Sequence, residues 1–519
     1  MKTTFLRFLL VLLTMSMAGN LFSQYTCEIE DEGVDMLRSE ITNKYIPDEY
    51  IPNMYIKVNF HFMMKSDSTL NFTPFDDGNG NCGFSAYEYS DILISFANSM
   101  LAQNSQMHLP LGNNTPILQR KYRLLLQDIY FHYDDMAYSY QSQESNTYNY
   151  SINPENEINV FLVYDADPDG YTGGGNANMS QNRHVRIKAA WQKYINGGGN
   201  DGIWGDAWVL VHETGHNLGL HHTMHKPRGT CCTINDNCDD WCTDTPTLNE
   251  IIESGQPNPC PSWGDTISTK SNNIMDYSGL QSVTPEQLGI IHHTLMHDML
   301  PYLYDDYCVI NNNEPEYVLE TGQDLTWQND RILKNNLVIE NGAKLTLKDC
   351  ILHIPSGANI IVKQGGRLIV DGATITNRCG LMWSGIEVWG NSAAHQYPVS
   401  GHYAQGYVEL KNGAVIENAV CALELWRPGH WSTTGGIVHA NNATFRNCAM
   451  AVHALHYTNH HPVTGHEANY NSQFRDCTFT VDEDYIGAPT FSRHIDLTHV
   501  NGIGFMGCDF SVVRGEIGG

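Results

Sequence analysis

The side chains that could act together in one chemical reaction lie in one short stretch of the chain. Residues 211–222 have the sequence VHETGHNLGLHH, which contains the spacing H-E-x-x-H-x-x-G-x-x-H. Residues four apart share one face of a helix, so His212 and His216 can direct two imidazole nitrogens at one metal ion. Glu213 lies one position along, where it can act on water without ligating the metal. The stretch therefore predicts a catalytic zinc site.

A third ligand is expected from beyond the helix. Gly219 can adopt positive φ, which ends the helix and lets the chain turn so that His222 returns to the metal. Three protein ligands leave a fourth position for water, as in catalytic zinc sites. Downstream, residues 272–278 have the sequence NNIMDYS. Met275 is expected as an apolar floor beneath the histidines, with Tyr277 in reach of the metal or of a tetrahedral oxyanion.

These motifs resemble the metzincin metallopeptidases and, among them, the pappalysin family (M43). The resemblance covers roughly residues 50–300 and rests on four features: Gly219-Leu220, Asp244-Thr245-Pro246 with Cys260-Pro261, the methionine segment, and Thr284-Pro285-Glu286-Gln287. It implies an α+β domain with a mixed twisted sheet, an active-site helix and a C-terminal helix. It also implies zinc on the three histidines, Glu213 as general base and acid, and support of the transition state from Met275 and Tyr277. The reaction implied is zinc-dependent hydrolysis of internal peptide bonds.

The elements that must position this site follow from hydrophobic periodicity. Strand patterns occur over 54–62, 122–133 and 158–164. A further short strand, 184–191, is the expected edge strand to which an extended substrate would add. Helices are predicted over 85–103, with Ser85 as N-cap, and over 207–220. Thr284, Pro285 and Gln287 together predict the start of a last helix.

Composition and the first residues predict an exported protein. The 519 residues carry a formal charge of −28, which disfavours nucleic acid and anionic membranes as partners. Lys2 and Arg7 precede an apolar run over 8–17, with cleavage sites after Ala18 and Ser23. That run is too short to span a bilayer, and no later segment reaches about 18 apolar residues. We expect a secreted bacterial protein.

A cysteine-rich insert follows the histidine motif. It holds Cys231, Cys232, Cys238, Cys242 and Cys260. Export favours disulfides over a second zinc site here, although their pairing stays open. Four carboxylates in the insert form either a Ca²⁺ site or a solvated acidic loop: Asp236, Asp239, Asp240 and Asp244.

The chain divides into five predicted segments. These are a signal peptide (1–23), a pro-segment (24–50), a peptidase domain (51–304), a linker (305–323) and a repeat domain (324–519). In the pro-segment, Cys27 either blocks the zinc as a latency thiolate or pairs in an ordinary disulfide.

The last third of the chain has the pattern of a coiled parallel sheet. Short alternating runs follow Gly-containing turns, and Phe445-Arg446-Asn447-Cys448 recurs as Phe474-Arg475-Asp476-Cys477 and Phe505-Met506-Gly507-Cys508. The region resembles all-β right-handed parallel β-helices of the pectin-lyase-like kind, in which like residues stack on like. The final Gly518-Gly519 follows a rung without a polar cap, so the chain is expected to be truncated or unusually short. The alternative function is adhesion or glycan binding through this domain, with Trp383, Trp389, Trp426 and Trp431 either stacking on sugars or filling the core.

Overall fold

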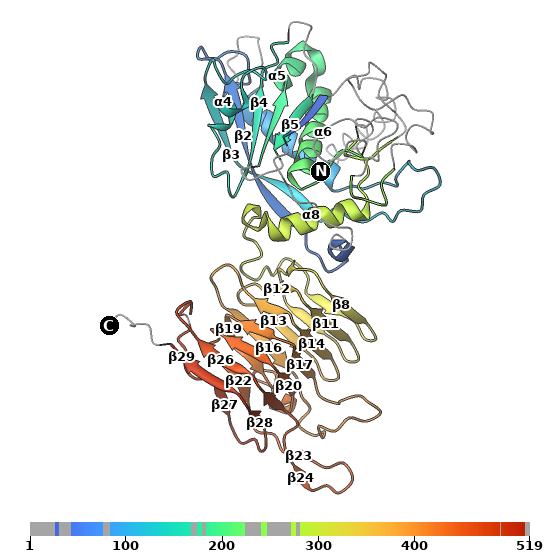
Figure 1. Ribbon diagram of the computed structural model, residues 1–519, viewed down its shortest axis with the longest axis vertical. Coiled ribbons are helices and arrows are strands. Elements are labelled where there is room, and N and C mark those ends of the chain that lie inside the picture. Colours follow the sequence, from blue (N-terminus) through green and yellow to red (C-terminus); the bar gives the residue numbers. More distant parts are fainter. Residues whose placement is uncertain are drawn as a thin grey trace, which may run out of the picture. The chain divides into compact units, whose positions relative to one another are not determined.

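The computed structural model describes residues 26–30, 43–75, 84–167, 174–178, 183–223, 240–246, 271–276, 281–487 and 489–513 (Figure 1). The chain forms two compact units. Unit 1 comprises Met1–Pro47 and Asn53–Tyr304, and unit 2 comprises Asp48–Pro52 and Asp305–Gly519. None of the helices in the described ranges is long and apolar enough to cross a membrane.

Unit 1 is built on a mixed sheet flanked by helices. Its strands are β1 (Thr26–Glu30), β2 (Met54–Met64), β3 (Tyr122–Tyr133), β4 (Ile158–Val163), β5 (Gly174–Asn178) and β6 (His184–Lys188). Its helices are α3 (Ala86–Leu101), α4 (Glu144–Tyr148), α5 (Ala190–Lys193), α6 (Gly199–Asn217) and α8 (Pro285–His297), with short helical turns at Asn43–Tyr45, Tyr194–Gly198 and Leu300–Tyr302. The expected strands and helices are therefore confirmed in type, with most bounds within a few residues.

The strand order of the sheet corrects one expectation. The order is β1-β5-β6-β4-β2-β3, and only β5 and β6 run antiparallel to each other. The sequence predicts the strand at 184–191 as the edge, but β6 lies between β5 and β4 and ends at Lys188. The strand at 174–178 was not predicted, because its sequence, GGNAN, has neither apolar alternation nor β-branched residues.

Helix α6 carries the histidine motif and is held by its neighbours on both sides. It packs on β5 and β6 and on α3. Buried Asp206 of α6 accepts a hydrogen bond from the Tyr89 hydroxyl of α3 at 2.8 Å and pairs with Lys193 of α5. The helix ends at Asn217, before the predicted end at residue 220, because Gly219 takes φ +90. The predicted turn at this glycine is thereby confirmed.

Unit 2 is a coil of three parallel sheets, each with seven strands in its described part. Successive strands visit the three sheets in turn, so each turn of the coil adds one strand to each (Figure 1). The first sheet contains β7 (Tyr317–Leu319), β10 (Leu337–Ile339), β13 (Asn359–Val362), β16 (Trp383–Val388), β19 (Ala419–Glu424), β22 (Met450–Ala454) and β27 (Ile495–Leu497).

The second sheet contains β8 (Asp324–Trp327), β11 (Lys344–Lys348), β14 (Arg367–Asp371), β17 (Tyr407–Lys411), β20 (Ile437–Asn441), β25 (Gln473–Arg475) and β28 (Gly504–Met506). The third contains β9 (Arg331–Ile332), β12 (Ile351–His353), β15 (Thr374–Thr376), β18 (Ala414–Glu417), β21 (Ala443–Arg446), β26 (Thr478–Val481) and β29 (Asp509–Val512). An antiparallel pair, β23 (Asn459–His460) and β24 (Glu467–Ala468), interrupts the coil. The β-helix architecture expected from the repeats is present.

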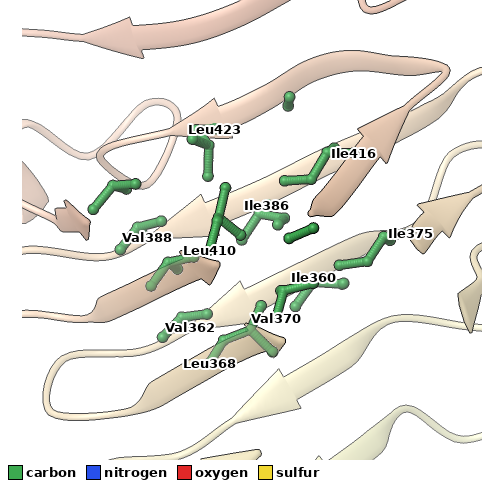
Figure 2. Packing of buried hydrophobic residues seen from close by; sticks show 14 of the residues in the cluster. Ile360, Val362, Leu368, Val370, Ile375, Ile386, Val388, Leu410, Ile416 and Leu423 are labelled. Carbon is green, nitrogen blue, oxygen red and sulfur yellow. The ribbon is translucent and has the colours of Figure 1, made fainter. Parts of the chain in front are cut away.

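The core of unit 2 consists of columns of stacked apolar side chains. Figure 2 shows them pointing inward from successive turns, for example Val362 next to Val388. The phenylalanines form two columns, not the one that the repeat suggests. Phe445, Phe479 and Phe510 stack in the third sheet, and Phe474 stacks on Phe505 in the second. The repeated motif misleads because Phe445 and Phe474 occupy different sheets.

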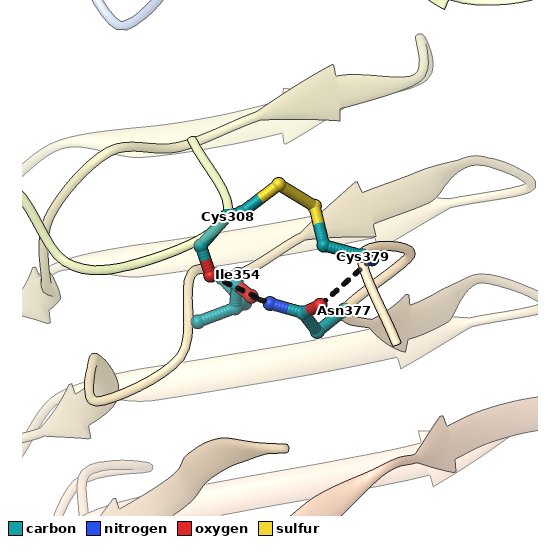
Figure 3. The surroundings of a disulfide bond; sticks show 4 residues. All are labelled: Cys308, Ile354, Asn377 and Cys379. Atoms are coloured by element: carbon teal, nitrogen blue, oxygen red, sulfur yellow. Dashed lines mark hydrogen bonds between the residues drawn. A yellow bond between two sulfur atoms is a disulfide. The ribbon is translucent and has the colours of Figure 1, made fainter. Parts of the chain in front are cut away.

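A disulfide closes the start of unit 2. Cys308 and Cys379 are bonded across a sequence separation of 71 (Figure 3). The Asn377 side-chain amide donates to the carbonyl of Cys308 at 3.2 Å and to that of Ile354 at 2.9 Å. Strand β7 lies within 305–323, the segment predicted as a linker, and pairs with β10. Both features fix this segment to the coil.

Five residues from far upstream also belong to unit 2. Asp48 forms a two-pronged ion pair with Arg331, at 3.0 and 2.8 Å. The Tyr50 ring packs at 5.6 Å from that of Trp327, and its hydroxyl donates to Gln323 at 3.0 Å. Residues 48–50, assigned from the sequence to a pro-segment, thus form part of unit 2, with Tyr50 in its core.

Candidate active site

Three histidine side chains converge in unit 1. His212 and His216 come from α6 and His222 from the segment after its end, and all three are buried. The Nε2 atom of His222 lies 3.0 Å from that of His212 and 3.2 Å from that of His216. Nitrogens about 2.0–2.1 Å from a tetrahedral zinc ion lie about 3.3–3.4 Å apart. The spacing of the three Nε2 atoms therefore fits ligation of one zinc ion.

The far nitrogen of each helical ligand is fixed by a backbone carbonyl. Nδ1 of His212 donates to the Ile274 carbonyl at 2.6 Å, and Nδ1 of His216 donates to the Leu220 carbonyl at 2.7 Å. A proton on Nδ1 leaves the Nε2 lone pair free to bind a metal. Burial lowers the pKa of His212 to about 4, which keeps its ring neutral at physiological pH. These residues fit the ion that their spacing implies.

Met275 lies directly beneath this site. Its side chain is fully buried, and a Cβ placed on Gly215 of α6 would lie 2.8 Å from its Sδ atom. Gly215 thus lets the sulfur approach the helix next to His216. The Thr223 backbone N–H donates to the Met275 carbonyl at 3.3 Å, which ties this turn to the segment that carries His222.

The N-terminus of α8 holds the methionine turn in place. Thr284 and Gln287 form the predicted capping box, which confirms the start of this helix. The Gln287 side chain also donates to Asn273 Oδ1 at 3.1 Å and accepts from Asn273 Nδ2 at 2.8 Å. Asn273 Oδ1 in turn accepts from the Met275 backbone N–H at 2.9 Å. One capping residue therefore supports the floor of the site.

Glu213 is buried and faces strand β5. A Cβ built on Gly175 would lie 3.1 Å from Glu213 Oε1 and 2.8 Å from Val209 Cγ1. Gly175 therefore leaves room for the carboxylate between α6 and the sheet. Strand β1 pairs parallel to the outer edge of β5, with Cys27 in register with Gly175. Of the predicted site residues, the structure thus brings the three histidines together, and it places Glu213 on the same helix and Met275 against that helix.

Several other predicted residues lie outside the described ranges. Tyr277, Asp236 and Asp239 are among them, as is the segment 1–23. Asp244 is described, and its carboxylate lies within 4.8 Å of the ligand atoms of Cys242 and Glu286. Asp240 instead accepts hydrogen bonds from the Cys242 backbone N–H and the Thr245 hydroxyl. Calcium prefers oxygen ligands only, so a calcium site in this insert stays a prediction.

Three supporting roles were missed from the sequence, those of Gly215, Gln287 and Gly175. Gly215 weakens a helix interior, and that cost is a signal that another group approaches closely there. The sequence indicates Gln287 as an N-cap partner alone, whereas its amide also serves Asn273. No sequence signal is available for Gly175, since it lies in the segment not recognised as a strand.

Comparison with known proteins places this site in context. Residues 87–223 match the family model described as Metallo-peptidase family M12B Reprolysin-like. No curated protein sequence matches the chain. Among solved structures, a mutant of promirolysin from Tannerella forsythia is 13% identical, with 51% of this chain and 86% of that chain covered. The TM-score of that comparison is 0.29, too low to support an argument about shared structure.

Proposed function

We propose that this zinc metallopeptidase is a secreted endopeptidase with Glu213 as general base and acid. The observation that carries this proposal is the convergence of three Nε2 atoms, each helical ligand being held through its Nδ1 atom. Zinc bound there supplies a Lewis acid that lowers the pKa of water to about 7.

Glu213 is the proton carrier of the proposed reaction. Its carboxylate accepts a proton from the attacking water and passes it to the amine released when the peptide bond breaks. The side chain is buried, and the glycine opposite keeps space for it, so its position is fixed before substrate arrives. Support of the oxyanion by Tyr277 is part of the same proposal.

The outer edge of β5 is the proposed place for an extended substrate. A peptide in this position would add to the sheet by backbone hydrogen bonds. Its residue next to Gly175 would lie at the strand position that faces Glu213. In the full chain β1 pairs with this edge. A pro-segment that takes up the substrate position is the simplest account of that pairing.

Latency through Cys27 is a further part of the proposal. Cys27 is in register with Gly175, the position next to the Glu213 carboxylate. On this backbone register we propose that Cys27 acts as a zinc-blocking thiolate and does not form an ordinary disulfide. We also retain the finer assignment to the pappalysin type, on the motifs around Gly219, Met275 and Thr284, although the family model that matches is the reprolysin-like one.

The test of the peptidase proposal is digestion of a peptide library by the processed protein, read by mass spectrometry, with and without a zinc chelator. We expect cleavage at internal bonds that stops on chelation and returns with zinc. Glu213→Ala should keep zinc and lose activity on the order of 10³-fold or more. Asp201→Ala, an exposed change on the same helix, is the matched control and should cleave normally. Release of terminal residues only, or near-normal cleavage by Glu213→Ala, contradicts the proposal.

Latency has its own test. Full-length protein purified without processing should be nearly inactive, and Cys27→Ala should be active at once. Glu28→Gln changes the next residue of β1 and should remain latent. Equal latency of the wild type and Cys27→Ala would exclude the thiolate mechanism while leaving the peptidase proposal intact.

A further inference from the structure

Two neighbouring turns of unit 2 carry the same outward-facing motif. Strand β16 continues into Glu387-Val388-Trp389, and β19 continues into Glu424-Leu425-Trp426. Glu387 and Glu424 are paired in register on the parallel sheet. In each motif the indole N–H donates to the carboxylate two residues earlier, at 2.7 Å for Trp389 and Glu387. The repeat therefore sets two indoles and two carboxylates side by side.

The middle residue of each motif shows which way the indoles face. Val388 and Leu425 are buried in the core of unit 2, and the residues on either side of them lie outside that core, with 9% of Trp426 exposed. A third indole, Trp431, lies 5.3 Å from Trp426 between ring centroids and is 67% exposed. Trp389, Trp426 and Trp431 form what we call the indole patch. Its exposed member gives a solvent-facing aromatic surface.

Charged groups of both signs surround the indole patch. Arg427 lies 4.6 Å from the Trp389 ring centroid, and Lys363 lies 5.9 Å from it. His453 Nδ1 contacts Glu424 Oε1 at 2.5 Å. Lys363 also pairs with Glu340, so three carboxylates and two cations border the patch. Donors and acceptors both border the aromatic surface.

The indole patch differs from the tryptophans that only fill the core. Trp383 is completely buried, and its N–H donates to the backbone carbonyl of Glu417. The interpretation of the four tryptophans as core residues is therefore right for Trp383 and wrong for Trp431. An indole exposed to water and bordered by polar side chains is a common feature of binding surfaces.

We propose that the indole patch binds an uncharged carbohydrate chain. A sugar ring has an apolar face of C–H groups, which suits stacking on Trp431, and an edge of hydroxyls that both donate and accept. Glu387 and Glu424 offer acceptors for those hydroxyls, and Arg427 offers donors. A cationic ligand would have to compete with Lys363 and Arg427, which already contact the Trp389 ring. Anionic ligands are disfavoured by the two carboxylates.

Affinity electrophoresis of the full chain tests this proposal. Native gels contain soluble xylan, mixed-linkage glucan or galactomannan, and parallel gels contain polygalacturonate, denatured casein or no polymer. We expect retardation by at least one of the three neutral polysaccharides. Trp431→Ala should weaken it about ten-fold or more, as loss of an aromatic anchor does. Trp431→Phe, which keeps an aromatic face, should retain most of the binding.

Val463→Ala is the matched control, because Val463 is 86% exposed in a loop of the same unit and belongs to no part of the patch. It should be retarded as the wild type is. Peptide hydrolysis should be unchanged in all three variants, so the outcome is independent of the peptidase proposal. No retardation by any neutral polysaccharide, or equal retardation of wild type and Trp431→Ala, would overturn the proposal. Retardation by polygalacturonate alone, or by casein alone, would overturn it as well.

Discussion

The two units of this chain stabilise their key side chains in opposite ways. In unit 1 the residues of the zinc site have individual partners: the Ile274 carbonyl for His212, the Leu220 carbonyl for His216, and for Met275 the Asn273 side chain that Gln287 holds. In unit 2 one contact is repeated from turn to turn, as in the column Phe445, Phe479 and Phe510. A catalytic site requires that each side chain be held by its own contacts. A repeat domain can instead be built from copies of one contact.

The contrast predicts different responses to damage. A change at the zinc site removes a partner that no other residue replaces. A change in the coil removes one of many similar contacts, and its neighbours persist. Because the units have separate cores, we expect two unfolding transitions in calorimetry. The following changes test that expectation.

The largest effect is expected from His222→Ala. Loss of one of three ligands should abolish stable zinc binding and reduce peptide hydrolysis by on the order of 10³-fold or more. The unfolding transition of unit 2 should not move. Zinc content by mass spectrometry, peptide cleavage and calorimetry give the three readouts. A zinc-loaded, active variant would rule out the assigned ligand set.

The disulfide of unit 2 should give the next largest effect. Replacing Cys308 and Cys379 together by Ser removes a cross-link over a separation of 71, worth about 4 kcal/mol of unfolding free energy in the chain-entropy model. Denaturant unfolding of unit 2 should weaken accordingly, with peptidase activity retained. A loss confined to the transition of unit 1 would contradict the division into units.

Gly215→Ala tests the contact below the zinc site. The added Cβ would lie 2.8 Å from Met275 Sδ, so the methionine must shift. We expect a cost of about 1–3 kcal/mol in unit 1 and weaker zinc binding. Asp201→Ala on the same helix provides the comparison. Unchanged stability and zinc affinity would show that Met275 is not held against the helix.

Acid should weaken unit 1 through two histidines of its sheet, the buried His61 and the half-buried His132. Burial lowers the pKa of His61 to about 3 and that of His132 to about 4, and the two rings are joined at 2.9 Å. The folded state then binds fewer protons than the unfolded state, so stability is lost as pH falls from about 6.5 towards these values. Thermal unfolding at pH 7 and pH 5 measures the loss. His132→Phe should reduce it, and an identical loss in that variant would exclude this cause.

Lys344→Ala should have the smallest effect. Its ion pair with Asp324, at 2.8 Å, lies on the surface of unit 2 with 34% and 62% of the two side chains exposed. Such pairs contribute less than about 0.5 kcal/mol. A shift of several degrees in the unit 2 transition would mean that surface charge, not the stacked core, governs its stability.

Much of this structure was predictable because local patterns and tertiary roles agree. Alternating residues at 122–133 form β3 with the expected bounds, and Thr284 caps α8 as its sequence indicates. The zinc ligands were predictable because helical spacing alone brings His212 and His216 together. The third ligand was predictable because Gly219 adopts a positive φ, which few other residues do, and this turn brings His222 to the site.

Other features depend on contacts that no local pattern encodes. Strand β5 has a glycine-rich sequence, and its Gly175 leaves the space that Val209 and Glu213 of α6 occupy. The repeat at Phe445 and Phe474 was visible in the sequence, but their placement in different sheets depends on how many residues each turn contains. Val388 and Trp389 alternate between core and surface, so the same motif serves both packing and the indole patch.

The segment Asp48–Pro52 makes unit 2 discontinuous in sequence. A fragment that starts at residue 305 would leave Trp327 and Arg331 without the Tyr50 and Asp48 contacts. Recombination therefore cannot transfer unit 2 as one uninterrupted stretch of sequence. Any proteolytic processing of the chain would meet the same constraint: a cut before Asp48 spares the coil, whereas a cut between residues 52 and 53 leaves its first turn holding a detached peptide.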